Sequence, residues 1–142
     1  MDHITAERRS WLMSRVHPKD TTPELVVRRE LHAAGFRFRL HRKDLPGKPD
    51  VVLVSRKVAI FVHGCFWHRH AGCSKASVPK SNIEFWRAKF ERNVKRDLDQ
   101  ERLLRDRGWR VLTIWECQTK TRGNALASLL ALLEQDEERR AS

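Results

Sequence analysis

Two apolar runs within residues 51–63, which read VVLVSRKVAIFVH, set the expected architecture. The runs, 51–54 and 58–62, are rich in β-branched residues, and the polar turn Ser55-Arg56-Lys57 separates them. This pattern is typical of two consecutive strands joined by a short connection. The second run lacks polar alternation, so we expect it to be buried on both faces of a sheet.

A helix is expected before these runs, over residues 23–34. Thr22 fits its N-cap, Pro23 fits its first position, and Gly35 fits the stop at its end. The inward face of this helix is predicted to carry Val27, Leu31 and Ala34. Glu24 lies one turn before Val27 on that same face, which is an unusual place for an acid.

Further elements follow on both sides. Alternation of apolar and basic residues predicts a strand over 36–40, and a third apolar run predicts one over 109–115. Helices are expected over about 83–107, ended by Gly108, and over about 124–138. Their predicted inward residues are Trp86, Phe90, Val94 and Leu98 in the first, and Leu126, Leu129, Leu130 and Leu133 in the second. The order of elements predicts an α/β fold, a mixed sheet flanked by helices.

Composition indicates a single basic domain. The 142 residues include 29 Lys and Arg against 18 Asp and Glu, for a formal net charge of +11. This excess favours nucleic acid as partner, because each neutralised phosphate releases counterions. A solvated basic surface and an anionic membrane surface are the alternatives, but the basic residues are scattered across elements rather than massed on one amphipathic helix. No apolar stretch approaches the roughly 18 residues of a membrane span. Residues 1–20 are polar, without clear periodicity, and predict an N-terminal arm before one domain over 21–142.

All three cysteines fit one metal site with a histidine. Cys65, His70 and Cys73 have the spacing C-x4-H-x2-C, and Cys117 is a distant fourth ligand. Three thiolates and an imidazole suit a closed, structural zinc site. Unconnected buried thiols are the alternative, and His63 or His68 could exchange with His70 as the ligand. An odd cysteine count without an apolar leader favours a reducing, cytoplasmic location.

Polar residues at strand ends indicate catalysis. Asp50 directly precedes one predicted strand, and His63 and His68 follow the next. A carboxylate there can hold Mg²⁺, and a nearby imidazole can accept a proton from water, which together permit phosphodiester hydrolysis. The alternatives are an ordinary turn aspartate and hydrogen-bonded histidines. Phe66 and Trp67 fit either base stacking or core packing.

Six phrases carry a resemblance to a known family. They are LPGKPD (45–50), FVHGCFWH (61–68), EFW (84–86), NVKRD (93–97), GWRVL (108–112) and WEC (115–117). Together they resemble the very short patch repair (Vsr) DNA mismatch endonucleases, over residues from about 13 to 117. The resemblance implies a restriction-endonuclease-like fold with a structural zinc site. It also implies a Mg²⁺-dependent enzyme that nicks double-stranded DNA on the 5′ side of the thymine in a T:G mismatch, a product of 5-methylcytosine deamination.

The resemblance also implies residue roles. Asp50 matches the metal-binding aspartate, His68 the general base, His63 a second active-site histidine, and Glu24 a supporting acid. Cys65, His70, Cys73 and Cys117 match the zinc ligands. The positions matched to DNA binding are Phe66, Trp67 and Trp86 as intercalating aromatics, Met13 and Val16 in the arm, and Asn93.

Two positions depart from the family pattern. Val62 stands where some members have threonine, so a Mg²⁺-binding role there would rest on its backbone carbonyl. The step from His70 to Cys73 contains Ala71-Gly72, one residue longer than in some members, and flexible Gly72 would absorb the difference. A monomer is expected, since a single-strand nick needs one active site. The alternative functions are a restriction-type nuclease that cuts matched duplex and a zinc-stabilised binding module without catalysis.

Overall fold

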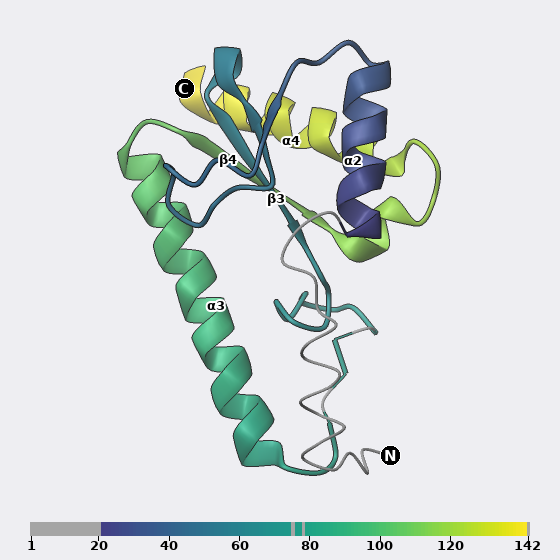
Figure 1. Ribbon diagram of the computed structural model, residues 1–142, viewed down its shortest axis with the longest axis vertical. Coiled ribbons are helices and arrows are strands. Elements are labelled where there is room, and N and C mark those ends of the chain that lie inside the picture. Colours follow the sequence, from purple (N-terminus) through teal and green to yellow (C-terminus); the bar gives the residue numbers. More distant parts are fainter. Residues whose placement is uncertain (1–20, 75, 78, 142) are drawn as a thin grey trace.

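The computed structural model describes residues 21–74, 76–77 and 79–141 (Figure 1). The expected arm over residues 1–20, with Met13 and Val16, lies outside them. In chain order the elements are α2 (Thr22–Ala33), β1 (Arg39–Leu40), β2 (Val51–Leu53), η1 (Val54–Arg56), β3 (Val58–His63), α3 (Ile83–Asp106), β4 (Arg110–Trp115), η2 (Glu116–Thr119) and α4 (Asn124–Ala141). The predicted order of helices and strands is confirmed, and no described helix is long and apolar enough to cross a membrane.

Within the described residues, the sheet has four strands in the order β1-β2-β3-β4. The pairs β1–β2 and β2–β3 are antiparallel, whereas β3–β4 is parallel, so the sheet is mixed as predicted. Because the parallel register pairs His63 with Trp115, the loop after β3 starts beside the segment after β4. This pairing brings residues 64–73 next to Glu116 and Cys117.

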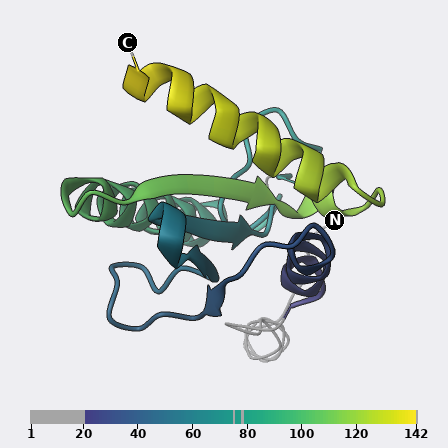
Figure 2. The same cartoon turned by 90° about the horizontal axis from the view of Figure 1, so that it is seen from above.

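Helices cover both faces of the sheet, as alternate strand residues require. On one face Val51, Ile60 and Ile114 pack with residues of α2 and α4, and α4 lies against β4 (Figure 2). On the other face Val52 and Ala59 pack with Leu104 of α3 and with neighbouring residues. The prediction that residues 58–62 are buried on both faces is therefore confirmed for Val58–Phe61, and Val62 at the end is half-buried.

The start of α2 differs by one residue from the prediction. Thr21, not Thr22, is the N-cap, and its Oγ1 accepts a hydrogen bond from the backbone N–H of Glu24 at 3.4 Å. The expected buried acid is confirmed, because Glu24 is 3% exposed. Ala34 is exposed rather than inward-facing, since it is the C-cap residue, beyond the last turn.

The predicted inward stripes fail in part. Val94 and Leu98 are 36% and 61% exposed, because steps of four residues rotate the stripe by about 40° each around a helix of 3.6 residues per turn. The buried line of α3 instead runs from Trp86 and Phe90 through Asn93 to Leu104. The prediction that Leu130 of α4 faces inward is also wrong, because this residue is 46% exposed.

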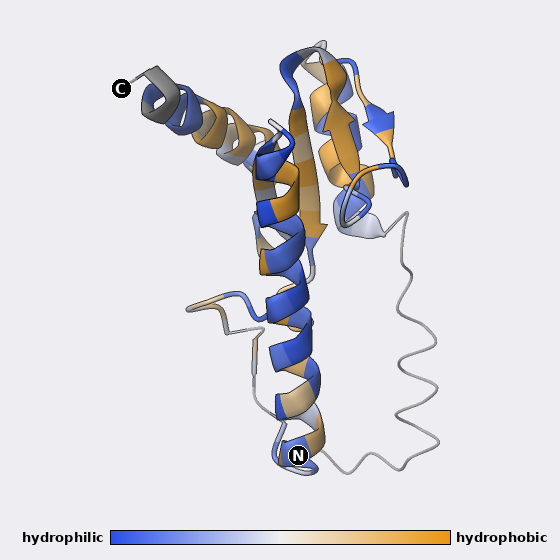
Figure 3. Cartoon of the chain, turned by 90° about the vertical axis from the view of Figure 1, so that its left-hand side faces the viewer, coloured by the Kyte–Doolittle hydropathy of each residue, from blue (hydrophilic) through white to orange (hydrophobic). Residues whose placement is uncertain are grey.

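The position of α3 explains why its buried residues form this line. Figure 3 shows a mostly hydrophilic helix with scattered apolar residues, and its N-terminal half extends beyond the sheet. That half packs against the loop after β3, where the ring of Phe66 contacts those of Trp86 and Phe90. The predicted strand over 36–40 is likewise shorter, since β1 contains Arg39 and Leu40 alone.

Candidate active site and metal centre

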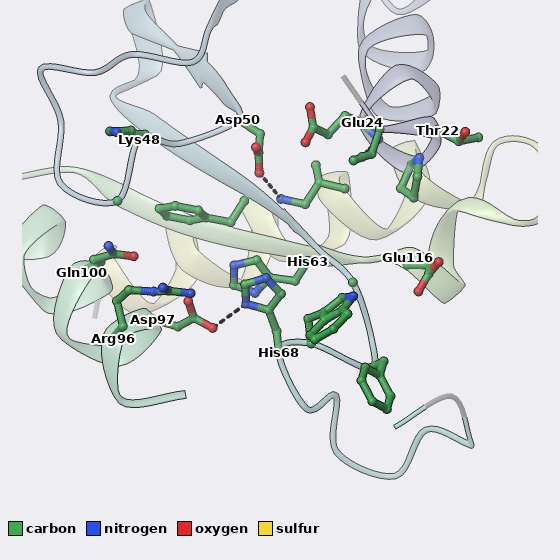
Figure 4. Close-up of a pocket in the computed structure, with 18 residues that line it drawn as sticks. Thr22, Glu24, Lys48, Asp50, His63, His68, Arg96, Asp97, Gln100 and Glu116 are labelled. Atoms are coloured by element: carbon green, nitrogen blue, oxygen red, sulfur yellow. Dashed lines mark hydrogen bonds and ion pairs between the residues drawn. The ribbon is translucent and has the colours of Figure 1, made fainter. Parts of the chain in front are cut away.

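A pocket lies at the edge of the sheet where β3 and β4 end (Figure 4). Its walls come from the start of α2, the loop before β2, the end of β3 with the loop that follows, and α3. Since β2 is antiparallel to β3, the residue before β2 also lies at this edge. The topology therefore collects side chains from four distant parts of the chain.

One side of the pocket holds a group that we call the carboxylate corner, made of Glu24, His41 and Asp50. Their ligand atoms lie within 4.8 Å of one another. Oδ2 of Asp50 accepts a hydrogen bond of 2.7 Å from the backbone N–H of Val62. Burial, with the nearby charge of Glu24, raises the pKa of Asp50 to about 7. Two adjacent, poorly hydrated carboxyl groups of this kind fit a divalent cation, which would relieve their repulsion.

Arg28 connects two members of the carboxylate corner. Its Nη2 lies 3.2 Å from Oε2 of Glu24 and 2.9 Å from Nε2 of His41. The same Nε2 lies 3.7 Å from Oε2 of Glu24. The side chain of Glu24 is 4% exposed, so this guanidinium supplies a positive charge next to a nearly buried carboxylate.

The other side of the pocket holds two stacked histidines and an aspartate. The rings of His63 and His68 are nearly parallel, at 4°, with centroids 3.9 Å apart. Nδ1 of His68 lies 2.6 Å from Oδ2 of Asp97. A carboxylate at that distance holds the proton on Nδ1 and leaves the lone pair of Nε2 available. Burial, with the neighbouring His68, lowers the pKa of His63 to about 4, so His63 is neutral at neutral pH.

Figure 4 shows these two groups on opposite sides of the end of β3. Asp50 and Glu24 lie on one side, and His63, His68 and Asp97 lie on the other. The same pocket is lined by Lys48 from the loop before β2 and by Arg96 of α3. The arrangement joins carboxylates, a positioned imidazole and cationic side chains around one space, and because the acids outnumber Lys48 and Arg96, an anionic substrate there would need a bound cation.

The predicted cysteine and histidine ligands form a separate cluster. The ligand atoms of Cys65, His70, Cys73 and Cys117 lie within 4.8 Å of one another, and Sγ of Cys117 is 3.5 Å from Nδ1 of His70. The structure therefore selects His70, and not its neighbours, for this cluster. Gly72 has a φ of 73°, a conformation that L side chains rarely adopt, and so accommodates the longer loop.

This cluster has the chemistry of a metal site. Three sulfurs and one nitrogen in tetrahedral number fit a soft or borderline cation. Burial raises the pKa of the Cys65 thiol to about 11, so a metal ion would be needed to hold its thiolate. The ring of His70 also stacks on Trp115, at 4.3 Å and 12°, which fixes its orientation.

Aromatic side chains gather between this cluster and the start of α3. Phe66 and Trp67 are half-buried and line the pocket. Trp86 is 5% exposed and Phe90 is 8% exposed, beneath them. We call these four residues the aromatic cluster. Phe66 and Trp67 are therefore not core residues, since both are half-buried at the pocket, and base stacking by them stays a prediction.

Two polar side chains brace the loop that carries Phe66 and Trp67. Asn93 is 8% exposed and donates its Nδ2 to the carbonyl of Trp67 at 3.1 Å. The guanidinium of Arg69 lies 4.0 Å from the ring centroid of Phe90 and donates to the carbonyl of Phe66 at 3.1 Å. The loop is therefore tied to α3 through hydrogen bonds and a cation–π contact.

Known proteins resemble this chain over most of its length. The family described as DNA mismatch endonuclease Vsr matches residues 1–75. Type II nicking enzyme V.XorIIP of Xanthomonas oryzae is 48% identical, over 94% of this chain and 97% of that protein. DNA mismatch endonuclease Vsr of Escherichia coli is 40% identical, over 80% of this chain and 72% of that protein. The chain belongs to the Vsr family. Type II nicking enzyme V.NmeAIP of Neisseria meningitidis is a further relative, 43% identical over 85% of this chain.

Most residues that the resemblance to the Vsr family singled out are brought together. Glu24, Asp50, Val62, His63 and His68 line one pocket. Phe66, Trp67, Trp86 and Asn93 meet in and beside the aromatic cluster. Their individual roles stay predictions, as do those of Met13 and Val16, which lie outside the described residues.

Several side chains of this Vsr-family chain were missed by the sequence analysis. Asp97 was quoted within a motif without a role, yet it contacts His68. Its signal was its place four residues after Asn93, on the same face of α3. Arg28, His41 and Arg69 were not singled out, because no local pattern relates residues that meet only after the chain has folded.

Proposed function

We propose that the protein is a DNA mismatch endonuclease that nicks one strand of a duplex, 5′ to the thymine of a T:G mismatch. One observation supports this most directly. In a chain of the Vsr family, a single pocket combines a buried and a half-buried carboxyl group with a histidine positioned by an aspartate. A binding module without catalysis would have no use for this arrangement.

Proton transfer is assigned to His68. Its Nε2 accepts a proton from the attacking water, while Asp97 holds the proton on Nδ1 and stabilises the imidazolium that forms. His63 is neutral and stacked beside it, so one ring N–H can donate to a phosphate oxygen. The role of His63 uses the neutral state that burial favours, and the role of His68 uses its contact with Asp97.

Asp50 is assigned to hold Mg²⁺, with Glu24 in support and the backbone carbonyl of Val62 as a further oxygen ligand. The fit rests on the carboxyl group of Asp50 and its raised pKa, while nearby Glu24, paired with Arg28, adds negative charge without being a direct ligand. Bound there, Mg²⁺ would supply charge stabilisation to the phosphate. The fold of the chain around this pocket is proposed to be restriction-endonuclease-like.

Zinc is the proposed occupant of the cluster of Cys65, His70, Cys73 and Cys117. It would tie the loop after β3 to the segment after β4, in addition to the 3.3 Å hydrogen bond from the N–H of Cys65 to Glu116. With four protein ligands the site is closed, so its role is structural.

The aromatic cluster is proposed to wedge into DNA at the mismatch. Phe66 and Trp67 lie at the accessible side of the cluster, and unstacking requires least energy at a mismatched pair. The indole N–H of Trp86 is buried and has no hydrogen-bond partner among the described residues. A buried donor in that state is destabilising by about 1–3 kcal/mol, which favours a cluster that rearranges when DNA enters.

A duplex panel tests this function. Labelled duplexes with one T:G, T:A or C:G pair in varied flanking sequence are incubated with Mg²⁺ or with EDTA, and the cut position is mapped on each strand. A single Mg²⁺-dependent nick 5′ to the mismatched thymine is expected. Cutting of the paired controls would support a restriction-type nuclease instead, and binding without cutting would support a non-catalytic module.

A further inference from the structure

We propose that Arg28 determines which metal ions the carboxylate corner accepts, by withholding Glu24 and His41 from the cation. This inference rests on the proposed role of Asp50 as the cation ligand. With Arg28 in place, the cation meets an oxygen site centred on Asp50. Without it, the same corner becomes a site of two carboxylates and one imidazole.

The geometry carries this proposal. The three ligand atoms of Glu24, His41 and Asp50 are close enough to share one cation, within 4.8 Å of one another. However, Nη2 of Arg28 lies 3.2 Å from Oε2 of Glu24 and 2.9 Å from Nε2 of His41. A guanidinium has donors and no acceptor, so it uses the lone pair of Nε2 that a metal ion would need. The guanidinium thus takes the place that a shared cation would take on these two atoms.

The helix and the strand hold this arrangement in position. Glu24 and Arg28 are four residues apart on α2, which places them on one face of the helix. His41 comes from the end of β1, where its φ of 48° and the bond from its N–H to the carbonyl of Asp50 fix the backbone. The side chains of Arg28 and His41 are 15% and 21% exposed, so their contact is shielded from water.

Ligand chemistry gives the direction of the effect. Mg²⁺ prefers oxygen ligands and keeps several waters, whereas imidazole suits transition metals. Removing Arg28 would add a nitrogen ligand and an uncompensated carboxylate. The nitrogen favours transition metals, Mn²⁺ among them, over Mg²⁺, while the extra negative charge raises the affinity of both ions. Arg28 therefore keeps the site selective for Mg²⁺.

The test measures binding of Mn²⁺ alone to the zinc-loaded protein without DNA, by the electron paramagnetic resonance signal of unbound Mn²⁺, with Mg²⁺ as competitor. For Arg28→Met we expect Mn²⁺ affinity to rise at least tenfold and Mg²⁺ affinity to rise less than threefold. The double variant Arg28→Met/His41→Gln should lose most of the Mn²⁺ gain. An equal gain for both ions, a gain that survives in the double variant, or no gain would overturn the proposal.

Three further variants keep the result decisive if Arg28→Met does not fold. Arg28→Lys keeps a charge beside Glu24 but cannot contact both atoms in the same way, so a smaller gain in Mn²⁺ affinity is expected. His41→Gln in the presence of Arg28 should leave Mn²⁺ affinity unchanged, and a loss would show that His41 is already a ligand. Asp50→Asn should abolish binding of both ions. If it does not, the proposed role of Asp50 fails, whatever the result for Arg28.

Discussion

The carboxyl group of Asp50 shows how a functional residue can oppose folding. It is half-buried beside Glu24, and its pKa rises from 3.8 to about 7. The folded protein therefore binds a proton more tightly than the unfolded chain does. As a consequence, stability is lost as the pH rises from about 4 to about 7, because deprotonation favours the unfolded chain. A bound cation would reverse this effect.

Asp50→Asn is accordingly expected to stabilise the protein in the absence of Mg²⁺. The amide keeps an oxygen for the N–H of Val62 and carries no charge. At pH 8 the midpoint of thermal unfolding should rise by about 4 °C or more, and the gain should shrink at pH 5. Asp44→Asn is the control, since this exposed acid pairs with Arg42 and should give no gain. A pH-independent gain for Asp50→Asn would contradict the account.

Asp97 is expected to act through His68. In Asp97→Asn, the amide can present its N–H₂ group to Nδ1 of His68, which would place the imidazole proton on Nε2 and remove the base. Nicking should fall by about 10²- to 10⁴-fold, with DNA affinity changed less than about twofold. Single-turnover kinetics and equilibrium binding check this. The control is Asp99→Asn on the same helix, where the acid is exposed and pairs with Lys95.

At the scale of elements, α3 has two halves with different tasks. Its C-terminal half covers the sheet through Leu104, whereas its N-terminal half supports the loop after β3. Asn93 and Asp97 lie between these two halves. Asn93 donates a hydrogen bond to the carbonyl of Trp67, and Asp97 contacts Nδ1 of His68. The helix therefore sets the distance between the aromatic cluster and His68, the proposed base.

Asn93→Ala should loosen the loop that carries Phe66 and Trp67. The carbonyl of Trp67 loses its partner, which is expected to destabilise that contact by about 1–3 kcal/mol. Affinity for a T:G duplex should fall while affinity for a matched duplex is kept, so the ratio of the two dissociation constants measures the effect. Val94→Ala, an exposed change one residue away, should leave the ratio unaltered. A uniform loss on both duplexes would point to a general DNA contact by Asn93 instead.

Zinc is expected to be required for the folded conformation of the loop between β3 and α3. Elemental analysis should give about one zinc per chain, and Cys117→Ala should lose it with a lower unfolding temperature. The loss follows from the shared cluster, in which Cys117 is the ligand from the far segment. Wild-type protein treated with a strong chelator is the matched comparison. Unchanged thermal unfolding after complete zinc removal would contradict a structural role.

At the scale of the whole molecule, the sequence predicted what local signals determine. Pro23 and Gly108 mark helix ends because one fixes φ and the other adopts a φ of 86°. The gathering of Cys65, Cys73 and Cys117 with a histidine was predictable, because three cysteines offer few combinations. Contacts set by rotation around a helix axis were not, and so Val94 was placed inward and Asp97 was given no role. The contact of Arg28 with His41 likewise depends on the packing of α2 against the sheet.

The central claim is that the carboxylate corner and His68 form one active site. The direct measurement is the single-turnover rate of nicking of a T:G duplex by Asp50→Asn and by His68→Gln, beside the DNA affinity of each. We predict a loss of about 10³-fold or more for Asp50→Asn and about 10²-fold or more for His68→Gln, with affinity nearly unchanged. Full nicking by a folded Asp50→Asn protein would contradict the account.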